Sequence, residues 1–241
     1  MEHIANIQEL EEPKGEDTIH GIIELECCKR TDIRYEEIRN RHYIENKGSH
    51  GQQLHFIVWY NSKIVGIISG ASSVYAVKTR DDFFGITKEN RQKYFLPAIV
   101  NNSVFRLEYH EKNLATKVLA LWRRVTAKLW EEIYGVSVIG FETFVIETGY
   151  RKGTLYKADN WVYVGETAGN TKSHKGLLNP STREVTCKKL IYCKWIKGKP
   201  IIPTTPYISS WRGETPEEKQ RAKDLARMKK DILGRRFTKE F

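Results

Sequence analysis

The feature that most constrains the fold is a pair of β-rich runs, Leu54–Tyr60 and Ile64–Gly70, separated only by the turn "NSK". Two such runs around a short polar turn predict a β-hairpin. Both runs are apolar at nearly every position, whereas a strand with one solvated face alternates. We therefore expect the hairpin to lie centrally in a sheet that other elements cover on both faces.

Helical patterns occur on both sides of the hairpin. From Leu114 to Ile133 apolar residues recur every three or four positions, with Asn113 as N-cap and Gly135 as the stop. Helical spacing also appears in "DTIHGIIELECCKR" and in "DIRYEEIRNRHY", where Asp32 is the expected N-cap. We expect "KTRDDFFG" to be a loop and "TLYKADN" a short helical turn. Further strands are expected at "SVFRLEYH", "VSVIGFETFVIE", "WVYVGE" and "EVTCKKLIYCKWI".

This order of elements predicts an α/β fold in which helices flank a mixed central sheet. It is also the order of the GNAT acyltransferase fold, so we expect a GNAT-like domain over residues 17–200. Residues 1–16 are expected to form a flexible arm or an early strand, and residues 201–241 a basic C-terminal extension. Within this extension Thr215, Pro216 and Glu218 predict the start of a helix over 216–233, and Gly234 its stop.

The positive charge is concentrated in the last third of the chain. Of the net +10, residues 172–241 carry 18 Lys and Arg against 7 Asp and Glu, whereas residues 1–171 carry 22 against 23. A local excess of cations is typical of proteins that bind polyanions such as DNA. A solvated basic tail is the alternative. The predicted DNA-phosphate contacts are Lys188, Lys194, Lys197, Arg221, Lys223, Arg227 and Lys230.

Composition favours a cytoplasmic protein without a membrane partner. We find neither a secretory signal nor the ~18 consecutive apolar residues of a membrane span. The four cysteines, Cys27, Cys28, Cys187 and Cys193, lack the CxxC spacing of metal ligands, so we expect reduced thiols.

Four segments between about Gly66 and Ala168 resemble the DruA-like proteins of Druantia anti-phage systems. They are "GASSVYAVKTRDDFFGI", "VNNSVFRLEYHEKNLATKVLAL", "LWEEIYGVSVIGFETFVIE" and "GTLYKADNWVYVGET", and they cover close to half of the chain. A more distant resemblance links the chain to the Mom-type phage proteins, which modify the exocyclic amine of adenine in DNA. The resemblance implies a GNAT-like fold that acts on nucleic acid, with DNA and other components of a phage or defence system as partners.

The resemblance also implies a set of site residues. The family usually has Ser where Thr116 stands, and Asp where Glu147 stands. An acyl-CoA or another acyl-type donor is implied by the fold, but the turn "HEKNLATK" lacks the glycines that cradle a pyrophosphate. The positions carried over are His42, Tyr43, Arg106, Asn113, Thr116, Glu142, Glu147, Tyr156, Asn160 and Trp161.

The chemistry of these residue types suggests roles for them. Glu142 or Glu147 is a candidate general base, and Tyr43 or Tyr156 a candidate general acid. Tyr156 and Trp161 are candidates to stack on an extruded base, although Trp161, Tyr163 and Val164 also fit a buried strand. Arg106, Asn113, Thr116 and Asn160 are candidate substrate-binding residues. Arg106 either pairs with Glu142 or Glu147 or holds an acidic donor, and His42 is a candidate metal ligand.

Three hypotheses follow from the sequence. The first is a transferase that modifies the exocyclic amine of a DNA base, as in Mom-like adenine modification. The second is a non-catalytic DNA-binding component of an anti-phage or mobile-element system. The third is a small-molecule N-acyltransferase.

Overall fold

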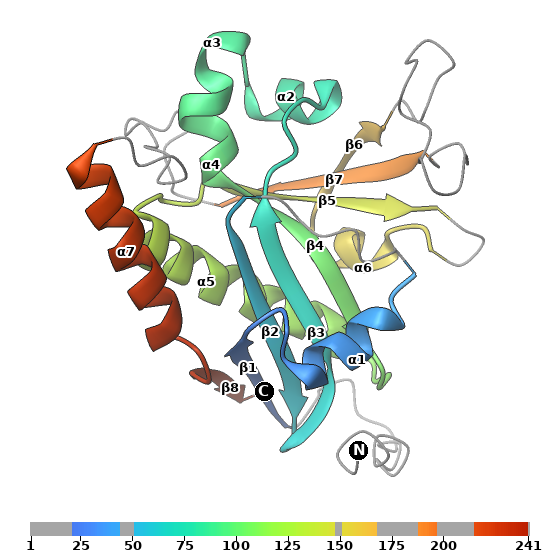
Figure 1. Cartoon of the computed structure of the whole chain (residues 1–241). Coiled ribbons are helices and arrows are strands. Elements are labelled where there is room, and N and C mark those ends of the chain that lie inside the picture. The colour runs from blue at the N-terminus through green and yellow to red at the C-terminus, as the bar shows by residue number, and fades with distance from the viewer. Residues whose placement is uncertain (1–20, 44–50, 148–150, 168–187, 197–214, 241) are drawn as a thin grey trace.

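A computed structural model of the chain describes residues 21–43, 51–147, 151–167, 188–196 and 215–240. These residues build an eight-stranded sheet in the order β6-β7-β5-β4-β3-β2-β1-β8 (Figure 1). Neighbouring strands are antiparallel except β4 and β5, which are parallel. The strands are β1 (Ile22–Cys28), β2 (Gln53–Tyr60), β3 (Lys63–Ser72), β4 (Ile99–Leu107), β5 (Gly140–Ile146), β6 (Val162–Glu166), β7 (Lys189–Trp195) and β8 (Arg236–Glu240).

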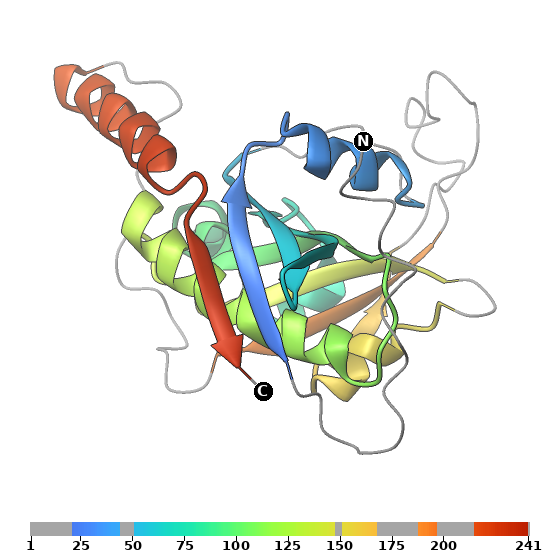
Figure 2. The ribbon, with the colours of Figure 1, turned by 90° about the horizontal axis from the view of Figure 1, so that it is seen from below.

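Helices cover both faces of this sheet, as seen from below in Figure 2. One face packs against α5 (Leu114–Tyr134) and α6 (Thr154–Ala158). The other face packs against α1 (Ile33–Asn40) and α2 (Lys78–Phe84). The remaining elements are α3 (Lys88–Asn90), the π-helical turn η2 (Arg91–Phe95), α4 (Leu96–Ala98) and α7 (Pro216–Asp231). The predicted fold class, a mixed α/β sheet flanked by helices, is confirmed.

The predicted hairpin is confirmed as β2 and β3. Phe56, Ile57 and Val58 on β2 are fully buried, as are Val65, Ile67 and Ile68 on β3. Consecutive buried residues on both strands mean that both faces of the hairpin are covered. Burial of a large aliphatic or aromatic side chain stabilises the fold by about 1.5–3 kcal/mol, so this hairpin anchors the core.

Both long helices begin and end close to the predicted positions. Asn113 precedes α5 in the left-handed conformation (φ 66°) and makes no side-chain capping bond, so it acts through its backbone. Gly135 ends α5 at φ 65°. In α7, Thr215 Oγ1 accepts a hydrogen bond from the Glu218 amide at 3.2 Å, and the Glu218 carboxylate accepts one from the Thr215 amide at 3.3 Å. The predicted capping box is therefore confirmed.

Two predicted elements were wrong. The segment "DTIHGIIELECCKR" contains strand β1, not a helix, because Ile23, Leu25 and Cys27 alternate along it into the core. The segment "KTRDDFFG" forms α2 rather than a loop, and Phe84 at its end is buried. In both cases the partners that decide the structure lie far away in the sequence.

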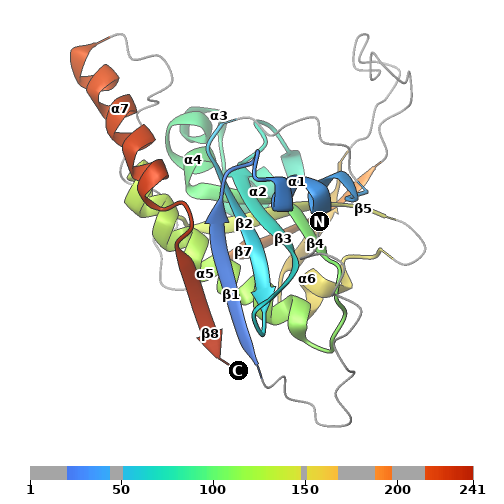
Figure 3. The same cartoon turned by 60° about the horizontal axis from the view of Figure 1, so that its bottom comes forward.

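Strand β8 was not predicted. After α7 the chain passes Gly234 (φ 78°) and returns antiparallel to β1, with Leu25 opposite Phe237 (Figure 3). The C-terminal end of the chain therefore joins the sheet. The domain boundaries remain predictions, and residues 1–16 lie outside the described ranges.

Among the described residues, no helix has both the length and the apolar character that crossing a membrane requires.

Candidate functional site

The candidate site lies where β4 and β5 separate. Within the described residues these parallel strands pair at three positions, from Ile99 opposite Gly140 to Asn101 opposite Glu142. Beyond this point β5 runs on against β7 and β4 runs on against β3, and the two diverge as Figure 1 shows. Thr143 Oγ1 donates to the Asn102 carbonyl at 3.1 Å just past the last pair. Parallel strands that part in this way leave backbone groups facing the gap, and those groups need partners.

A β-bulge in β4 lies at the same point. Gly70 pairs with Asn102 and Ser69 with Val104, so Ser103 is an extra residue on β4. The Asn101 Oδ1 and Ser103 Oγ atoms are buried, and neither has a hydrogen-bond partner in the described part of the chain. Buried polar atoms without partners are rare and call for an explanation.

The end of α1 reaches across the open end of this gap. On the β4 side, Arg41 pairs with Glu108 at 3.3 Å, and Glu108 also pairs with Arg106 at 2.5 Å. On the β5 side, the Tyr43 hydroxyl accepts a hydrogen bond from the backbone of Ile146. We call the set Arg41, Tyr43, Arg106, Glu108 and Arg151 the splay mouth.

The Tyr43 ring lies between two other side chains of this region. His42 stacks on it with ring centroids 4.5 Å apart, and the Arg151 guanidinium lies 4.1 Å from its centroid. Tyr43 is 37% exposed. Burial raises the pKa of its hydroxyl, opposed by Arg151 and by the Ile146 bond. Tyr43 therefore stays protonated at neutral pH and can donate a hydrogen bond.

Tyr156 lies deeper, on the α5 face of the sheet. Its hydroxyl donates to Asn102 Oδ1 at 2.8 Å, and its ring packs against Trp161 and Tyr192. Burial raises the pKa of Tyr156 above its usual range. The Trp161 ring is also buried, and its indole N–H donates to Asp159 Oδ2 at 2.7 Å. These two rings are part of the core and do not present an open stacking surface.

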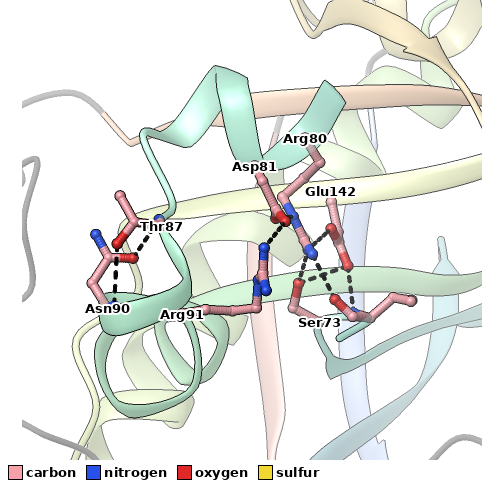
Figure 4. A network of polar contacts seen from close by, with 8 residues as sticks. Ser73, Arg80, Asp81, Thr87, Asn90, Arg91 and Glu142 are labelled. Atoms are coloured by element: carbon pink, nitrogen blue, oxygen red, sulfur yellow. Dashed lines mark hydrogen bonds and ion pairs between the residues drawn. The ribbon is translucent and has the colours of Figure 1, made fainter. Parts of the chain in front are cut away.

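Glu142 is fully buried in a polar network on the opposite face of β5 (Figure 4). Its Oε1 accepts hydrogen bonds from Ser73 Oγ at 2.8 Å and from the Val74 amide at 2.9 Å, and its Oε2 pairs with the buried Arg80. Arg80 also pairs with Asp81 at 2.6 Å and donates to the Val74 carbonyl. Burial raises the pKa of Glu142, and the Arg80 guanidinium acts against this rise. The hydrogen bonds that Ser73, Val74 and Arg80 donate to Glu142 stabilise the ionised form of its carboxylate.

Glu142 and Tyr156 therefore do not share a pocket. Glu142 is followed by Thr143, and successive side chains of a strand point to opposite faces; Thr143 bonds to Asn102 on the Tyr156 side. Glu147 follows the end of β5, is exposed, and interacts electrostatically with Tyr163 and Tyr192. Of the two carboxylates considered as a base, Glu147 is the accessible one.

The remaining predicted site residues are engaged in local contacts or exposed. Arg106 pairs with Glu108 and not with Glu142 or Glu147, so of its two expected roles the ion pair with one of these acids is not formed, and the binding of an acidic donor stays a prediction. Asn113 and Thr116 lie at the start of α5, where the Thr116 hydroxyl donates to the Asn113 carbonyl at 2.8 Å. Asn160 is exposed, with φ at 57°.

The predicted burial of the residues in and next to β6 was wrong in part. Tyr163, expected in the core, is 47% exposed, whereas Trp161 is 4% exposed. Val164 does pack against the core on the α2 face.

The predicted phosphate contacts divide between opposite edges of the sheet. Lys194 on β7 donates to the Asp159 carbonyl at 2.5 Å, and Lys188 next to β7 pairs with Glu166 at 3.7 Å. Strand β7 is one position from the β6 edge, whereas α7 leads into β8 at the other edge. Lys197 lies outside the described residues. Arg221, Lys223, Arg227 and Lys230 belong to α7.

The start of α5 does not fit an acyl-CoA pyrophosphate. Asn113 occupies the left-handed position without glycine, and the Thr116 hydroxyl is bonded back to the turn. The Glu111 carboxylate, three residues before the helix, accepts hydrogen bonds from Tyr60 and Tyr109 at 3.0 and 3.1 Å. A carboxylate at this end opposes the anion that a helix N-terminus attracts. Among the described residues, no group of three His, Cys, Asp or Glu side chains could hold a metal ion.

A comparison with protein families decides the relationship of the chain. Residues 2–181 match the family described as "Druantia protein DruA". The chain belongs to this DruA family. No curated protein matches it. The family match thus extends over the described elements from β1 to β6.

Solved structures similar to this DruA-family protein are acetyltransferases. They include the microcin C7 self-immunity acetyltransferase MccE with acetyl-CoA and AMP (14% identity, 60% of this chain and 61% of that chain, TM-score 0.37). The ribosomal-protein-S5-alanine acetyltransferase from Vibrio fischeri has 14% identity, 61% and 64% coverage, and a TM-score of 0.39. NAA60 from Arabidopsis thaliana with a bisubstrate analogue has 13% identity and a TM-score of 0.45, and the match covers 73% of this chain and 99% of that chain. The chain spans less than two thirds of the length of the first two proteins.

Sequence reasoning missed several residues that the structure brings to the gap. Asn102 contacts Tyr156, Arg151 contacts Tyr43, and Arg41 pairs with Glu108. None of the three gave a signal of its own, because each acts through a partner distant in sequence. Arg80 had a weak signal, since it is a cation between aromatic and aliphatic residues in "AVKTRDDFF". It lies 62 positions from Glu142.

Proposed function

We propose that this DruA-family protein is a transferase that modifies the exocyclic amine of a DNA base, with its reaction at the splay mouth. The observation that carries the proposal is the gap between β4 and β5, where Asn101 Oδ1 and Ser103 Oγ are buried without partners in the described chain. Family membership supports a role in an anti-phage system that contains other components.

The proposed step uses residues of the splay mouth together with Glu147, which lies outside that set. Glu147 is the accessible carboxylate at the end of β5, and a general base must reach the proton that it removes. In the proposed step the amine nitrogen attacks the electrophilic carbon of an acyl-type donor, and the bond to the leaving group breaks. The amine proton passes to Glu147. Tyr43 donates a hydrogen bond to the developing oxyanion, while Arg106 and Arg151 attract the negative charge of the donor and the DNA.

A non-catalytic DNA-binding role is the second candidate. It is favoured by the burial of Glu142 and Tyr156, whose polar atoms are already engaged within the protein. Under this alternative the gap recognises a nucleotide without changing it.

Mass spectrometry of nucleosides from the DNA of cells that express the protein tests the proposal. We expect a nucleoside of increased mass with the wild-type chain, and a reduction of about 100-fold or more with Glu147→Gln, since general-base catalysis contributes about 10²–10⁴-fold. Tyr43→Phe should also reduce it. Glu36→Gln, an exposed acid on α1 away from the splay mouth, is the matched control.

The outcomes separate the three hypotheses. If the wild-type chain yields no new nucleoside but binds DNA, the non-catalytic role is correct. If the purified protein acylates small amines and leaves DNA unmodified, it is a small-molecule acyltransferase. Equal yields from wild type and Glu147→Gln would contradict the role of Glu147.

A further inference from the structure

The outer face of α5 carries a row of cations. Residues 114–130 contain Lys117, Arg123, Arg124 and Lys128 and no acid. Lys117, Arg124 and Lys128 are spaced by seven and four residues, so they lie along one face of the helix over about 16 Å. Arg123 points elsewhere and pairs with Asp159 at 2.7 Å.

Strand β8 brings a fourth cation to this row. Phe237 packs into the core on the α5 side of the sheet, and Lys239, two residues further along the strand, points to the same face. The pairing of Ile23 with Lys239 fixes this register. In Figures 2 and 3, β8 and α5 lie side by side. The pKa of Lys239 is lowered by burial and then by Arg124 and Lys117, which places the three cations near one another.

Cations next to this row form ion pairs with acidic residues, whereas two members of the row do not. Arg235 pairs with Glu132 at 3.2 Å, and Arg236 pairs with Glu24 and Glu26, both at 3.4 Å. Arg124 and Lys128 are exposed and form no ion pair with any residue that the structure describes. Like charges in adjacent turns destabilise a helix, so the fold maintains this row at a cost in stability.

We propose that Lys117, Arg124, Lys128 and Lys239, which we call the α5–β8 row, bind the phosphate backbone of duplex DNA. A row of about 16 Å spans about five base-pair steps of one strand. The exposed large apolar residues of the described chain include none on α5, so the row lacks the apolar side chains with which an amphipathic helix enters a membrane. The inference needs DNA binding but not catalysis, so it does not depend on the transferase proposal.

Salt-dependent DNA binding of the full-length chain tests this inference. Fluorescence anisotropy with a labelled 20-base-pair duplex, measured over a range of salt concentrations, gives the slope of log K against log salt. The test variant is Arg124→Ala/Lys128→Ala/Lys239→Ala. The control is Lys78→Ala/Lys88→Ala/Lys157→Ala, which removes the same charge from exposed positions on α2, α3 and α6.

We expect the slope to become shallower by about 2–3 in the test variant, because each phosphate contact contributes about 0.9. The control should bind almost as wild type does. Equal slopes for test and control variants would overturn the inference, as would a wild-type chain that does not bind the duplex. Binding to vesicles of anionic phospholipid that exceeds DNA binding and depends on the same residues would overturn it too. A missing modified nucleoside together with the expected change of slope would contradict only the transferase proposal.

Discussion

The buried ion pair between Arg80 and Glu142 gives the sharpest test of how the gap is held. Glu142 on β5 and Arg80 on α2 are both fully buried, and α2 covers this face of the sheet. Replacement of Glu142 by Gln keeps an oxygen that can accept from Ser73 and Val74. It removes the negative charge and places an amide N–H group against the guanidinium of Arg80.

The magnitude follows from these contacts. A hydrogen bond to a charged group contributes about 1.5–3 kcal/mol, and removal of one partner from a buried pair costs about 3–5 kcal/mol in total. Asp81 remains 2.6 Å from Arg80 and neutralises part of the charge that Arg80 would otherwise carry unpaired. We therefore expect Glu142→Gln to lower the free energy of unfolding by about 3 kcal/mol, a large share of the ~5–15 kcal/mol of a typical domain.

Urea denaturation followed by tryptophan fluorescence measures this change. Arg80→Met should lower the free energy of unfolding at least as much as Glu142→Gln does. It removes the guanidinium that pairs with two carboxylates, those of Glu142 and Asp81. The double variant should cost less than the sum of the single variants. Glu147→Gln, an exposed acid just beyond the same strand, should change stability by less than about 0.5 kcal/mol. A cost below about 1 kcal/mol for Glu142→Gln, or strictly additive effects, would refute the reasoning.

Two further predictions concern buried polar contacts. His55 Nδ1 lies 3.0 Å from Ser69 Oγ, and burial, with Arg30, Lys229 and Arg39, lowers the pKa of His55 from 6.5 to about 4. As the pH drops, the unfolded chain binds the proton before the folded chain does. The free energy of unfolding should therefore fall by up to about 3 kcal/mol between pH 6.5 and 4, at about 1.4 kcal/mol per pH unit. Urea denaturation at several pH values should show this fall in wild type and not in His55→Asn. Tyr156→Phe leaves Asn102 Oδ1 without its donor and should cost about 1–3 kcal/mol, whereas a thermal melt unchanged from wild type would contradict the observed hydrogen bond.

The elements predicted correctly are those whose signals are local. The α7 capping box spans four residues, and the β2–β3 hairpin needs only two strands and a turn. The missed strands β1 and β8 are stabilised by each other across more than 200 residues, as in the pair of Glu24 and Thr238. A single-sequence pattern carries little information on such a contact, and the acids of β1 obscured its alternation further. Glu26, for example, is buried because Arg34, Trp59 and Arg236 bind it.

The candidate site was predicted in its residue types but not in its geometry. Tyr43 follows α1 and Tyr156 lies in α6, and their roles stay predictions. The role of Glu142 could not be decided from the sequence. A glutamate among apolar residues of a strand gives the same pattern whether it acts in catalysis or forms an ion pair with a covering helix. Its partner Arg80 decides the geometry, and no spacing rule connects residues 80 and 142.

These contacts explain how a gap between two parallel strands persists in a well-packed protein. Seven pairs hold β5 to β7 on its other side, and the ion pair of Glu142 with Arg80 fixes its buried face to α2. The bulge at Ser103 turns β4 away at the same level. At the open end, α1 is fastened to both strands through Arg41 and Tyr43. The gap is therefore held open by its surroundings, as the proposed transferase site would require, and loss of the Glu142 anchor should disturb it without touching the exposed Glu147.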